Sequence, residues 1–292
     1  MVREKKLTVC VINITTHPHS PEGYISLFHD AFNLRKPVKY RGDQYLILGK
    51  INELPLGSAV GYHGVLFRYV NISSTDAWLN TAKLEPVISE DGEPVVDIPS
   101  DMKPNCKMSS FIFIPSGHRM FFVSQHDNVN FSSAFTAKAL SILFNSNELV
   151  EKYGEVSVTV ESTDETITQI LEIPSLTRLV IGITLPNDDD VSGEMKNALE
   201  RMKAQKVKRQ RHELAGRKED GILPDDQTIA LMSLARSNGY VQADGYDGKR
   251  KVSEKTSSHP VEIRESYDPI NSSPWIRLQQ IARDNIQKFI RR

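Results

Sequence analysis

The chain has 292 residues, of which 39% are hydrophobic and 25% charged, and its formal net charge is −1 at pH 7. These values are ordinary for a soluble globular protein, and the length favours two domains. No stretch approaches the roughly 18 to 20 uninterrupted apolar residues of a membrane span, so composition argues against membrane insertion.

The cysteine content favours a reducing compartment. Cys10 and Cys106 lie far apart in the sequence and form no CxxC pair. This arrangement favours two free thiols and argues against a metal site built from cysteine. Residues 1–6 lead into the strand-like run at 7–14, which is too polar for the apolar core of a secretory signal. We therefore expect a cytoplasmic protein.

The first elements expected are a strand and a helix. Residues 7–14 alternate as a strand with apolar side chains on both faces, so both faces can be covered. Ser20 and Pro21 are suited to the N-cap and the first position of a helix. The two faces of the strand carry Leu7, Val9 and Val11, and Ile12 and Ile14. The apolar stripe of the helix comprises Tyr24, Leu27, Phe28, Ala31 and Phe32.

Further short strands follow before a second helical region. Residues 45–51, 65–72, 111–114 and 120–123 are rich in β-branched or aromatic side chains. Residues 85–101 contain several acids and no Lys or Arg, which indicates a solvated loop or a face that excludes nucleic acid. Residues 132–153 are helical in pattern and end at Gly154. We predict an α+β domain over residues 1–154, with a mainly antiparallel sheet and packed helices.

A second α+β domain is predicted over residues 155–292. Residues 155–161 alternate as a strand, which either joins the first sheet or begins another. The most apolar later strand is 179–185, and the helix expected at 191–202 has an apolar stripe that can lie on a sheet. The members of that stripe are Met195, Ala198, Leu199 and Met202.

The last part of the chain is expected to contain a small β-meander and a closing helix. Residues 228–236 suit either a helix that ends at Asn238-Gly239 or a strand. The turn pairs Asp244-Gly245 and Asp247-Gly248 favour a meander, and residues 249–260 are polar enough to be mobile. An amphipathic helix is predicted at about 274–292, with an apolar stripe of Trp275, Leu278, Ile281, Ala282, Ile286 and Phe289.

Positive charge is concentrated in residues 201–218, which contain eight Lys or Arg residues and one acid, Glu213. Lys206 and Arg209 occupy the positions where the preceding helix would need apolar side chains. Lys and Arg are rarely buried without a partner. We therefore predict that this segment leaves the body of the protein as a projecting basic helix or a mobile arm.

Motifs for catalysis are absent from the sequence. There is no GxGxxG or GxxxxGK[ST] phosphate loop, no GxSxG and no HExxH. We assign no catalytic residue, no metal ligand and no cofactor. His17 and His19 would need a third ligand supplied by the fold to hold a metal. The acids Asp188, Asp189, Asp190, Asp225 and Asp226 precede expected helices or lie in a loop, where capping is the simpler role.

The basic run is typical of a surface that meets a polyanion, because neutralised phosphates release condensed counterions. It carries no set of side chains arranged to read base edges, so we expect binding without base selectivity. The alternatives are a solvated linker without a partner, an acidic protein partner and anionic lipid. The residues assigned to phosphate contacts are Lys203, Lys206, Lys208, Arg209 and Arg211, with Arg217, Lys218, Arg277 and Lys288 as outer support.

The order of elements in the second half resembles the RexA-like phage exclusion proteins. The shared features are an apolar strand at 178–185, a helix that runs into lysines and arginines, Asp226 with Thr228-Ile229 opening an expected strand, a turn-rich meander and a cationic closing helix. Such proteins are in turn similar to RdgC-like proteins, which dimerise around duplex DNA. The resemblance implies a homodimeric DNA-binding protein that acts in phage exclusion.

From these observations we expect a cytoplasmic, non-enzymatic protein that binds duplex DNA without sequence preference and acts in phage defence or another mobile-element function. Two alternatives remain. One is an effector nuclease that uses magnesium and Asp188, Asp189 or Asp225. The other is a sensor or adaptor that binds a partner effector protein.

Overall fold

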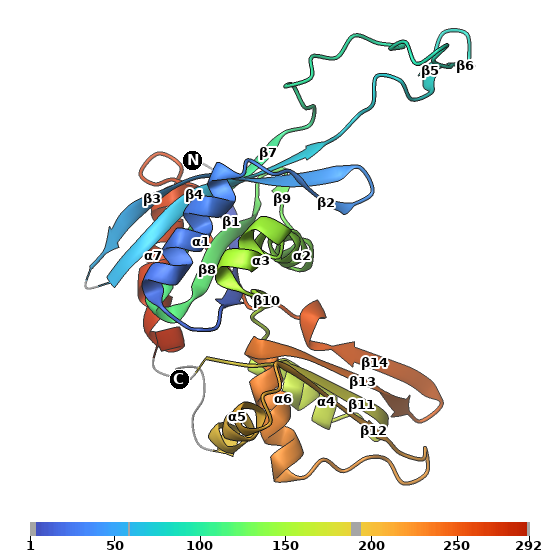
Figure 1. Ribbon diagram of the computed structural model, residues 1–292. Coiled ribbons are helices and arrows are strands. Elements are labelled where there is room, and N and C mark those ends of the chain that lie inside the picture. Colours follow the sequence, from blue (N-terminus) through green and yellow to red (C-terminus); the bar gives the residue numbers. More distant parts are fainter. Residues whose placement is uncertain (1–3, 58, 188–193, 291–292) are drawn as a thin grey trace.

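The computed structural model describes residues 4–57, 59–187 and 194–290. It shows an α+β fold of antiparallel sheets with packed helices, as the sequence predicted (Figure 1). The large sheet comprises β1 (Lys5–Thr15), β2 (Val38–Arg41), β3 (Gln44–Leu56), β4 (Ala59–Val70), β7 (Lys107–Ile114), β8 (Arg119–His126), β9 (Val129–Asn130), β10 (Ser157–Val160) and β15 (Glu262–Tyr267). The small sheet comprises β11 (Ser175–Thr184), β12 (Arg209–Ala215), β13 (Gly239–Asp247) and β14 (Arg250–Lys255).

Helices cover both faces of the large sheet, whose strand order is β10-β1-β8-β7-β4-β3-β2. One face packs against α1 (Pro21–Asn33), α2 (Ser133–Phe144) and α3 (Asn147–Tyr153), and the other packs against α7 (Pro274–Ile290). Strand β1 is therefore apolar on both sides. Ile12 and Ile14 face the first group of helices, and Val9 and Val11 face α7. The alternation predicted for residues 7–14 is confirmed.

Local signals fixed the start of α1. The Ser20 side chain accepts a hydrogen bond from the Gly23 amide, and Pro21 is the first helical residue. A hydroxyl at this position satisfies one of the amides that a helix N-terminus leaves unpaired. Tyr24 and Phe28 are then buried on the face that meets the sheet, as the spacing predicted.

The end of the chain returns to the large sheet. Strand β15 pairs with β1 over residues 5–10, and β10 pairs with the same strand over residues 12–15. The expected stripe of α7, from Trp275 to Ile286, packs on that sheet. A boundary at residue 154 therefore differs from the structure, in which β10, β15 and α7 belong with the N-terminal part. The side chain of Phe289 lies outside the described residues.

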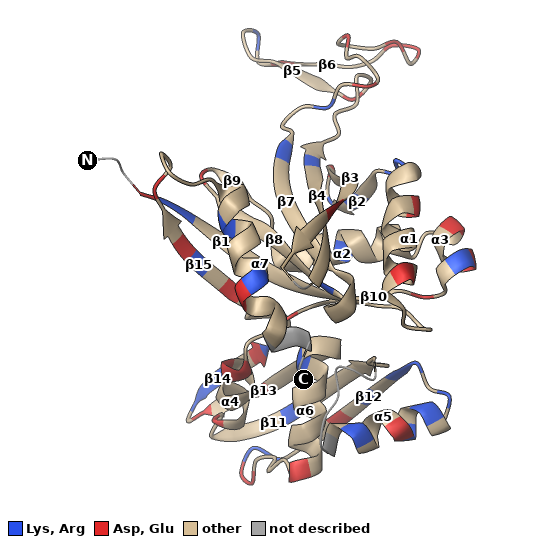
Figure 2. Ribbon diagram, turned by 90° about the vertical axis from the view of Figure 1, so that its left-hand side faces the viewer, with Lys and Arg blue, Asp and Glu red and all other residues tan. Residues whose placement is uncertain are grey.

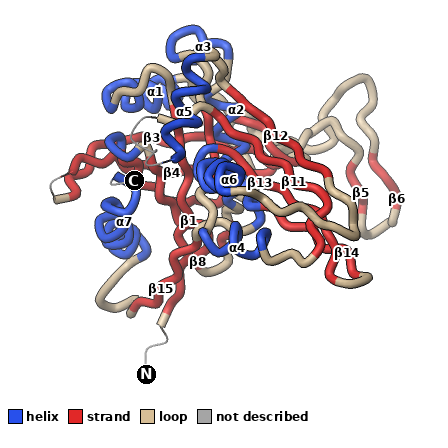
Figure 3. Tube along the Cα trace, turned by 90° about the horizontal axis from the view of Figure 1, so that it is seen from below, coloured by secondary structure: helices blue, strands red, loops and turns tan. Residues whose placement is uncertain are grey.

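The small sheet has a core of its own. The helices α4 (Asp164–Leu171), α5 (Glu194–Ala204) and α6 (Asp226–Asn238) contribute to this core, and α6 contacts β11 and β13 (Figure 3). Leu179, Ile181 and Ile183 face them. Residues 226–238 form a helix, so the helical alternative holds and the strand expected at Thr228-Ile229 is wrong. Residues 250–255, expected to be mobile, are strand β14.

The prediction that residues 201–218 leave the body of the protein as a helix or a mobile arm is wrong. Helix α5 ends at Ala204, Lys206 turns the chain with a positive φ of 55°, and residues 209–215 form the edge strand β12 beside β11. The alternating side chains of a strand allow exposed cations on one side and half-buried Gln210 and His212 on the other. The cationic side chains of this edge strand therefore stay in water while its backbone remains part of the small sheet.

Residues 71–106 form a long excursion between β4 and β7, which extends away from the large sheet (Figure 1). It contains the short hairpin of β5 (Trp78–Asn80) and β6 (Glu85–Val87). Its exposed large apolar side chains are Ile72, Leu79, Leu84, Val87, Ile88 and Met102. The acidic stretch expected at 85–101 lies in this excursion.

A buried polar network joins the large sheet to the small one. Arg119 Nε donates to Glu161 Oε1 at 2.6 Å, and Glu161 Oε2 accepts from Ser237 Oγ at 2.8 Å. Asn13 Nδ2 donates to the Ser237 carbonyl at 3.0 Å and to Asn238 Oδ1 at 3.1 Å. The side chains of Arg119 and Glu161 are 2% and 0% exposed. Ser237 and Asn238, the last residues of α6, belong to this network. The network therefore holds the small sheet against β1 and β8.

His118 lies beside this network, and its protonation predicts how stability depends on pH. The pKa of His118 is held well below its usual value of 6.5. Burial is the main cause, and the positive charge of the neighbouring Arg119 guanidinium is the second. The unfolded chain therefore takes up a proton below about pH 6.5 that the folded chain does not. We expect the free energy of unfolding to fall by up to about 1.4 kcal/mol per pH unit as pH decreases below that value.

Denaturant unfolding at pH 7.5 and pH 5.5 measures this effect, with His118→Asn as the comparison. Asparagine tolerates the left-handed backbone at this position, where φ is 40°. The variant should lose less stability than the parent between the two pH values. Equal losses would show that His118 does not carry the dependence.

Candidate functional site

In the described residues, the helices that pack on the small sheet all lie on one of its faces. Gly182 on β11 pairs with Tyr240 on β13 and with Arg211 on β12. Residues opposite one another in neighbouring strands share a face. Since Ile181 and Ile183 face the helices, Gly182, Tyr240 and Arg211 face the other way. The same register adds Thr184 with Arg209, and Gln242 with Lys255, to this open face.

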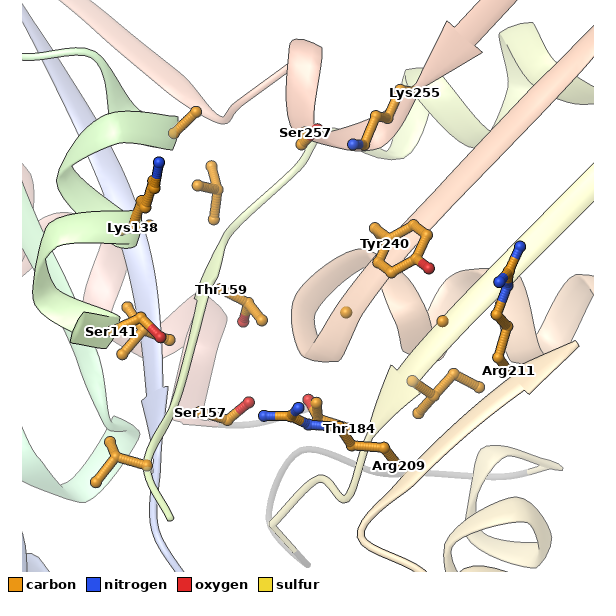
Figure 4. Close-up of a pocket in the computed structure, with 18 of the residues that line it drawn as sticks. Lys138, Ser141, Ser157, Thr159, Thr184, Arg209, Arg211, Tyr240, Lys255 and Ser257 are labelled. Atoms are coloured by element: carbon orange, nitrogen blue, oxygen red, sulfur yellow. The ribbon is translucent and has the colours of Figure 1, made fainter. Parts of the chain in front are cut away.

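At one end the open face forms a cleft with α2 and β10 (Figure 4). The cleft has a volume of about 640 Å³. One wall is formed by α2 and residues 156–160, and the other by β11, β12, β13 and the end of β14. This volume is within the range of pockets that hold small organic ligands.

The charged residues that line the cleft are all cationic. They are Lys138 from α2, Arg209 and Arg211 from β12, and Lys255 from β14. Among the described residues that line it there is no Asp or Glu, and the other polar side chains are hydroxyls and one amide. Figure 4 shows Lys138 on one wall, and Lys255, Tyr240 and Arg211 on the other. Such a lining concentrates positive potential in a confined space.

Two of these cations have ion-pair partners in the chain. Arg209 pairs with Glu155, which lies just before β10, and Arg211 Nη2 lies 2.7 Å from Glu213 Oε2. The side chains of Arg209 and Arg211 remain 66% and 56% exposed. A hydrogen bond from Arg178 holds the pKa of Glu213 below its usual range. Exposed pairs of this kind contribute about 0 to 1 kcal/mol each, so an incoming anion can replace the carboxylates.

Tyr240 lies across the sheet at Gly182. A Cβ atom at position 182 would overlap the Tyr240 ring, so only glycine permits this placement. Lys255 Nζ lies 5.6 Å from the centroid of the ring. The ring is half-buried, and it stands in the cleft between Lys255 and Arg211 (Figure 4).

The structure separates the nine cations predicted from the sequence. Arg209 and Arg211 line the cleft, and Lys208 lines a smaller hollow beside it. Lys203 and Lys206 lie at the end of α5 and in the following turn, so Lys and Arg gather around α5 and the start of β12 (Figure 2). Arg217 and Lys218 follow β12 at its other end, where Lys218 Nζ lies 4.0 Å from the Tyr246 ring centroid.

Of the other two predicted cations, Arg277 does not line the cleft. Arg277 is on α7, on the face of the large sheet opposite to α2, and its Nη1 donates to Gln280 Oε1 at 2.8 Å. The side chain of Lys288 lies outside the described residues. Lys138, Lys255 and Tyr240 were not predicted from the sequence. Strand pairing brings Tyr240 and Lys255 to the cleft, and the packing of α2 beside β10 brings Lys138.

Several residues considered above for a metal site or a nuclease site have structural hydrogen bonds. Asp225 caps α6 by accepting from the Thr228 amide at 2.8 Å. His17 Nε2 lies 2.9 Å from the Leu185 carbonyl, and His19 Nδ1 lies 3.0 Å from the Tyr24 hydroxyl. Asp188, Asp189 and Asp190, named for the nuclease alternative or as caps, lie outside the described residues.

Two features are absent from the residues that the structure describes. No group of three or more His, Cys, Asp or Glu side chains within that part of the chain is placed to hold a metal ion. In the same residues, no helix combines the length and apolar character needed to cross a membrane.

Comparisons with known proteins give a family and no activity. The model of a family described as a domain of unknown function, DUF4747, matches residues 5–283, which include both sheets and the cleft. No curated protein matches the sequence. Among solved structures, a PDZ domain protein from Parabacteroides distasonis is 9% identical over 90% of this chain and 73% of its own, with a TM-score of 0.14. A likeness of that size carries no argument about fold or function.

Proposed function

We propose that this chain, which belongs to the DUF4747 family, is a DNA-binding protein that holds the phosphate backbone in the cleft between its two sheets. The observation that carries the proposal is the lining of the cleft, whose charged members among the described residues are Lys138, Arg209, Arg211 and Lys255. Phosphate contacts by Lys and Arg supply affinity through counterion release.

The geometry favours phosphate over base edges as the target. One cation comes from a helix on one wall and the others come from strands on the opposite wall, whereas base readout uses a helix or ribbon inserted into a groove. Contacts of this kind position a nucleic acid without reading its sequence. The proposed binding is therefore indifferent to sequence.

The biological setting is also a proposal. The arrangement that resembles RexA-like proteins leads us to propose a role in phage exclusion or another mobile-element function, in the cytoplasm. We assign the implied homodimer contact to the excursion at 71–106, because this segment carries several exposed large apolar side chains and such side chains are typical of interaction surfaces. Sedimentation of the pure protein distinguishes a dimer from the 32.9 kDa monomer.

The dependence of affinity on salt tests the proposed function. Four phosphate contacts predict that log K against log salt has a slope of about −3.6 for duplex DNA and about −2.8 for a single strand. Fluorescence anisotropy with labelled DNA between about 50 and 200 mM salt measures this slope. Absence of binding at the lower salt concentration, or an affinity that does not change with salt, would contradict the proposal.

A further inference from the structure

The aromatic ring in the cleft adds something that phosphate binding alone does not need. Tyr240 belongs to β13, an inner strand of the small sheet, and it shares the open face with Arg211 and Lys255. Its ring lies over Gly182, where any side chain would displace it. The sheet therefore presents an aromatic ring with a cation on either side.

A base stacks on such a ring only when its own faces are free. In a duplex the faces of each base are covered by neighbouring base pairs, whereas an unpaired base can lie against an aromatic side chain. Proteins that bind single strands combine stacking rings with a positively charged groove that follows the backbone. The cleft has both features, with Tyr240 on the small-sheet wall and cations on both walls.

The size of the cleft agrees with this ligand. A volume of about 640 Å³ is that of a pocket for a small organic ligand. It has room for a short run of unpaired nucleotides, while a duplex would have to remain at the rim. The wall opposite Tyr240 supplies Lys138 and the Ser141 and Ser157 hydroxyls, which are donors for phosphate or sugar oxygens.

We propose that the cleft takes a single-stranded segment of nucleic acid, with one base stacked on Tyr240 and the adjoining phosphates held by Arg209, Arg211, Lys138 and Lys255. This inference rests on the proposed function and names the form of nucleic acid that the same site prefers. Deoxyribose and ribose strands share the chemistry that the cleft recognises, so the test includes both.

The experiment compares three labelled probes of one mixed sequence, each of about 20 nucleotides, a length that exceeds the site sizes of common single-strand binders. The probes are single-stranded DNA, single-stranded RNA and duplex DNA, and anisotropy gives the Kd of each at one salt concentration. A stacked base contributes about 5- to 150-fold to affinity. We expect at least one single strand to bind more tightly than the duplex.

Tyr240→Leu tests the stacking contact, because leucine still covers Gly182 but has no aromatic face. We expect it to weaken single-strand binding by about 5- to 150-fold and to leave duplex binding nearly unchanged. Tyr246→Leu is the matched control on the same strand and face, at a ring that Lys218 covers. It should change neither affinity. Unfolding curves establish that both variants are folded.

Each outcome is decisive. A single-strand preference that Tyr240→Leu removes and Tyr246→Leu retains supports the inference. Equal or tighter duplex binding, or a single-strand preference that Tyr240→Leu leaves intact, overturns the inference while the phosphate-binding proposal stands. No binding of any probe overturns the proposed function itself. The difference between the DNA and RNA arms identifies which strand the cleft accepts.

Discussion

Replacing the four cleft cations with serine should abolish most of the affinity for nucleic acid. The variant carries Lys138→Ser, Arg209→Ser, Arg211→Ser and Lys255→Ser, and it removes every charged side chain that lines the cleft in the described structure. If each lost contact costs about 1 kcal/mol, the four together cost about 4 kcal/mol, or roughly a thousandfold in Kd. The salt slope should also approach zero, because no counterions are released at the site.

A variant with the same change in net charge separates the site from the overall charge of the molecule. Lys50, Lys83, Lys103 and Arg283 are exposed and lie outside the cleft, and their replacement with serine should leave affinity and slope nearly unchanged. The cleft variant is expected to fold, since the pairs of Arg209 with Glu155 and Arg211 with Glu213 are exposed and weak. Equal losses in the two variants would show that the cleft is not the binding site.

The strands and helices with strong local signals were predictable from sequence. Strand β1 alternated on both faces, Ser20 and Pro21 marked the start of α1, and the apolar stripe of α7 fell at helical spacing. Each of these signals lies within a few neighbouring residues. Pairing between distant segments has no such signal. Nothing local in residues 262–267 shows that they lie beside residues 5–10.

The basic run shows where local reasoning failed. Lys206 and Arg209 showed that the apolar stripe of the helix does not continue, but a projecting helix or mobile arm was expected there, whereas α5 ends at Ala204 and β12 follows. The alternation from Arg209 to Glu213 also suits a strand, and an edge strand keeps cations in water as well as an arm does. Arg209 and Arg211 were assigned to the site from charge alone, whereas Lys138, Lys255 and Tyr240 depended on tertiary pairing.

Loss of the Glu161 carboxylate should be among the most destabilising single changes in the chain. Glu161→Ala leaves the buried Arg119 guanidinium without its carboxylate and Ser237 Oγ without its acceptor. Removing one partner of a buried pair costs about 3 to 5 kcal/mol, because the remaining charge stays out of water. Domains of ordinary stability unfold with about 5 to 15 kcal/mol, so this loss is a large part of the total. Denaturant unfolding at pH 7.5 gives the difference.

An exposed pair provides the comparison, because it loses the same chemical group without burial. Glu262 pairs with Arg264 at 2.5 Å, and these side chains are 35% and 75% exposed. Glu262→Ala should change the free energy of unfolding by less than about 1 kcal/mol. Combining Glu161→Ala with Arg119→Met should restore part of the lost stability, because the buried charge that has lost the Glu161 carboxylate is then removed. If the double variant were less stable than Glu161→Ala alone, loss of the charge pair between Arg119 and Glu161 would not be the cause, and the role of the network in holding the two sheets would rest on its neutral hydrogen bonds.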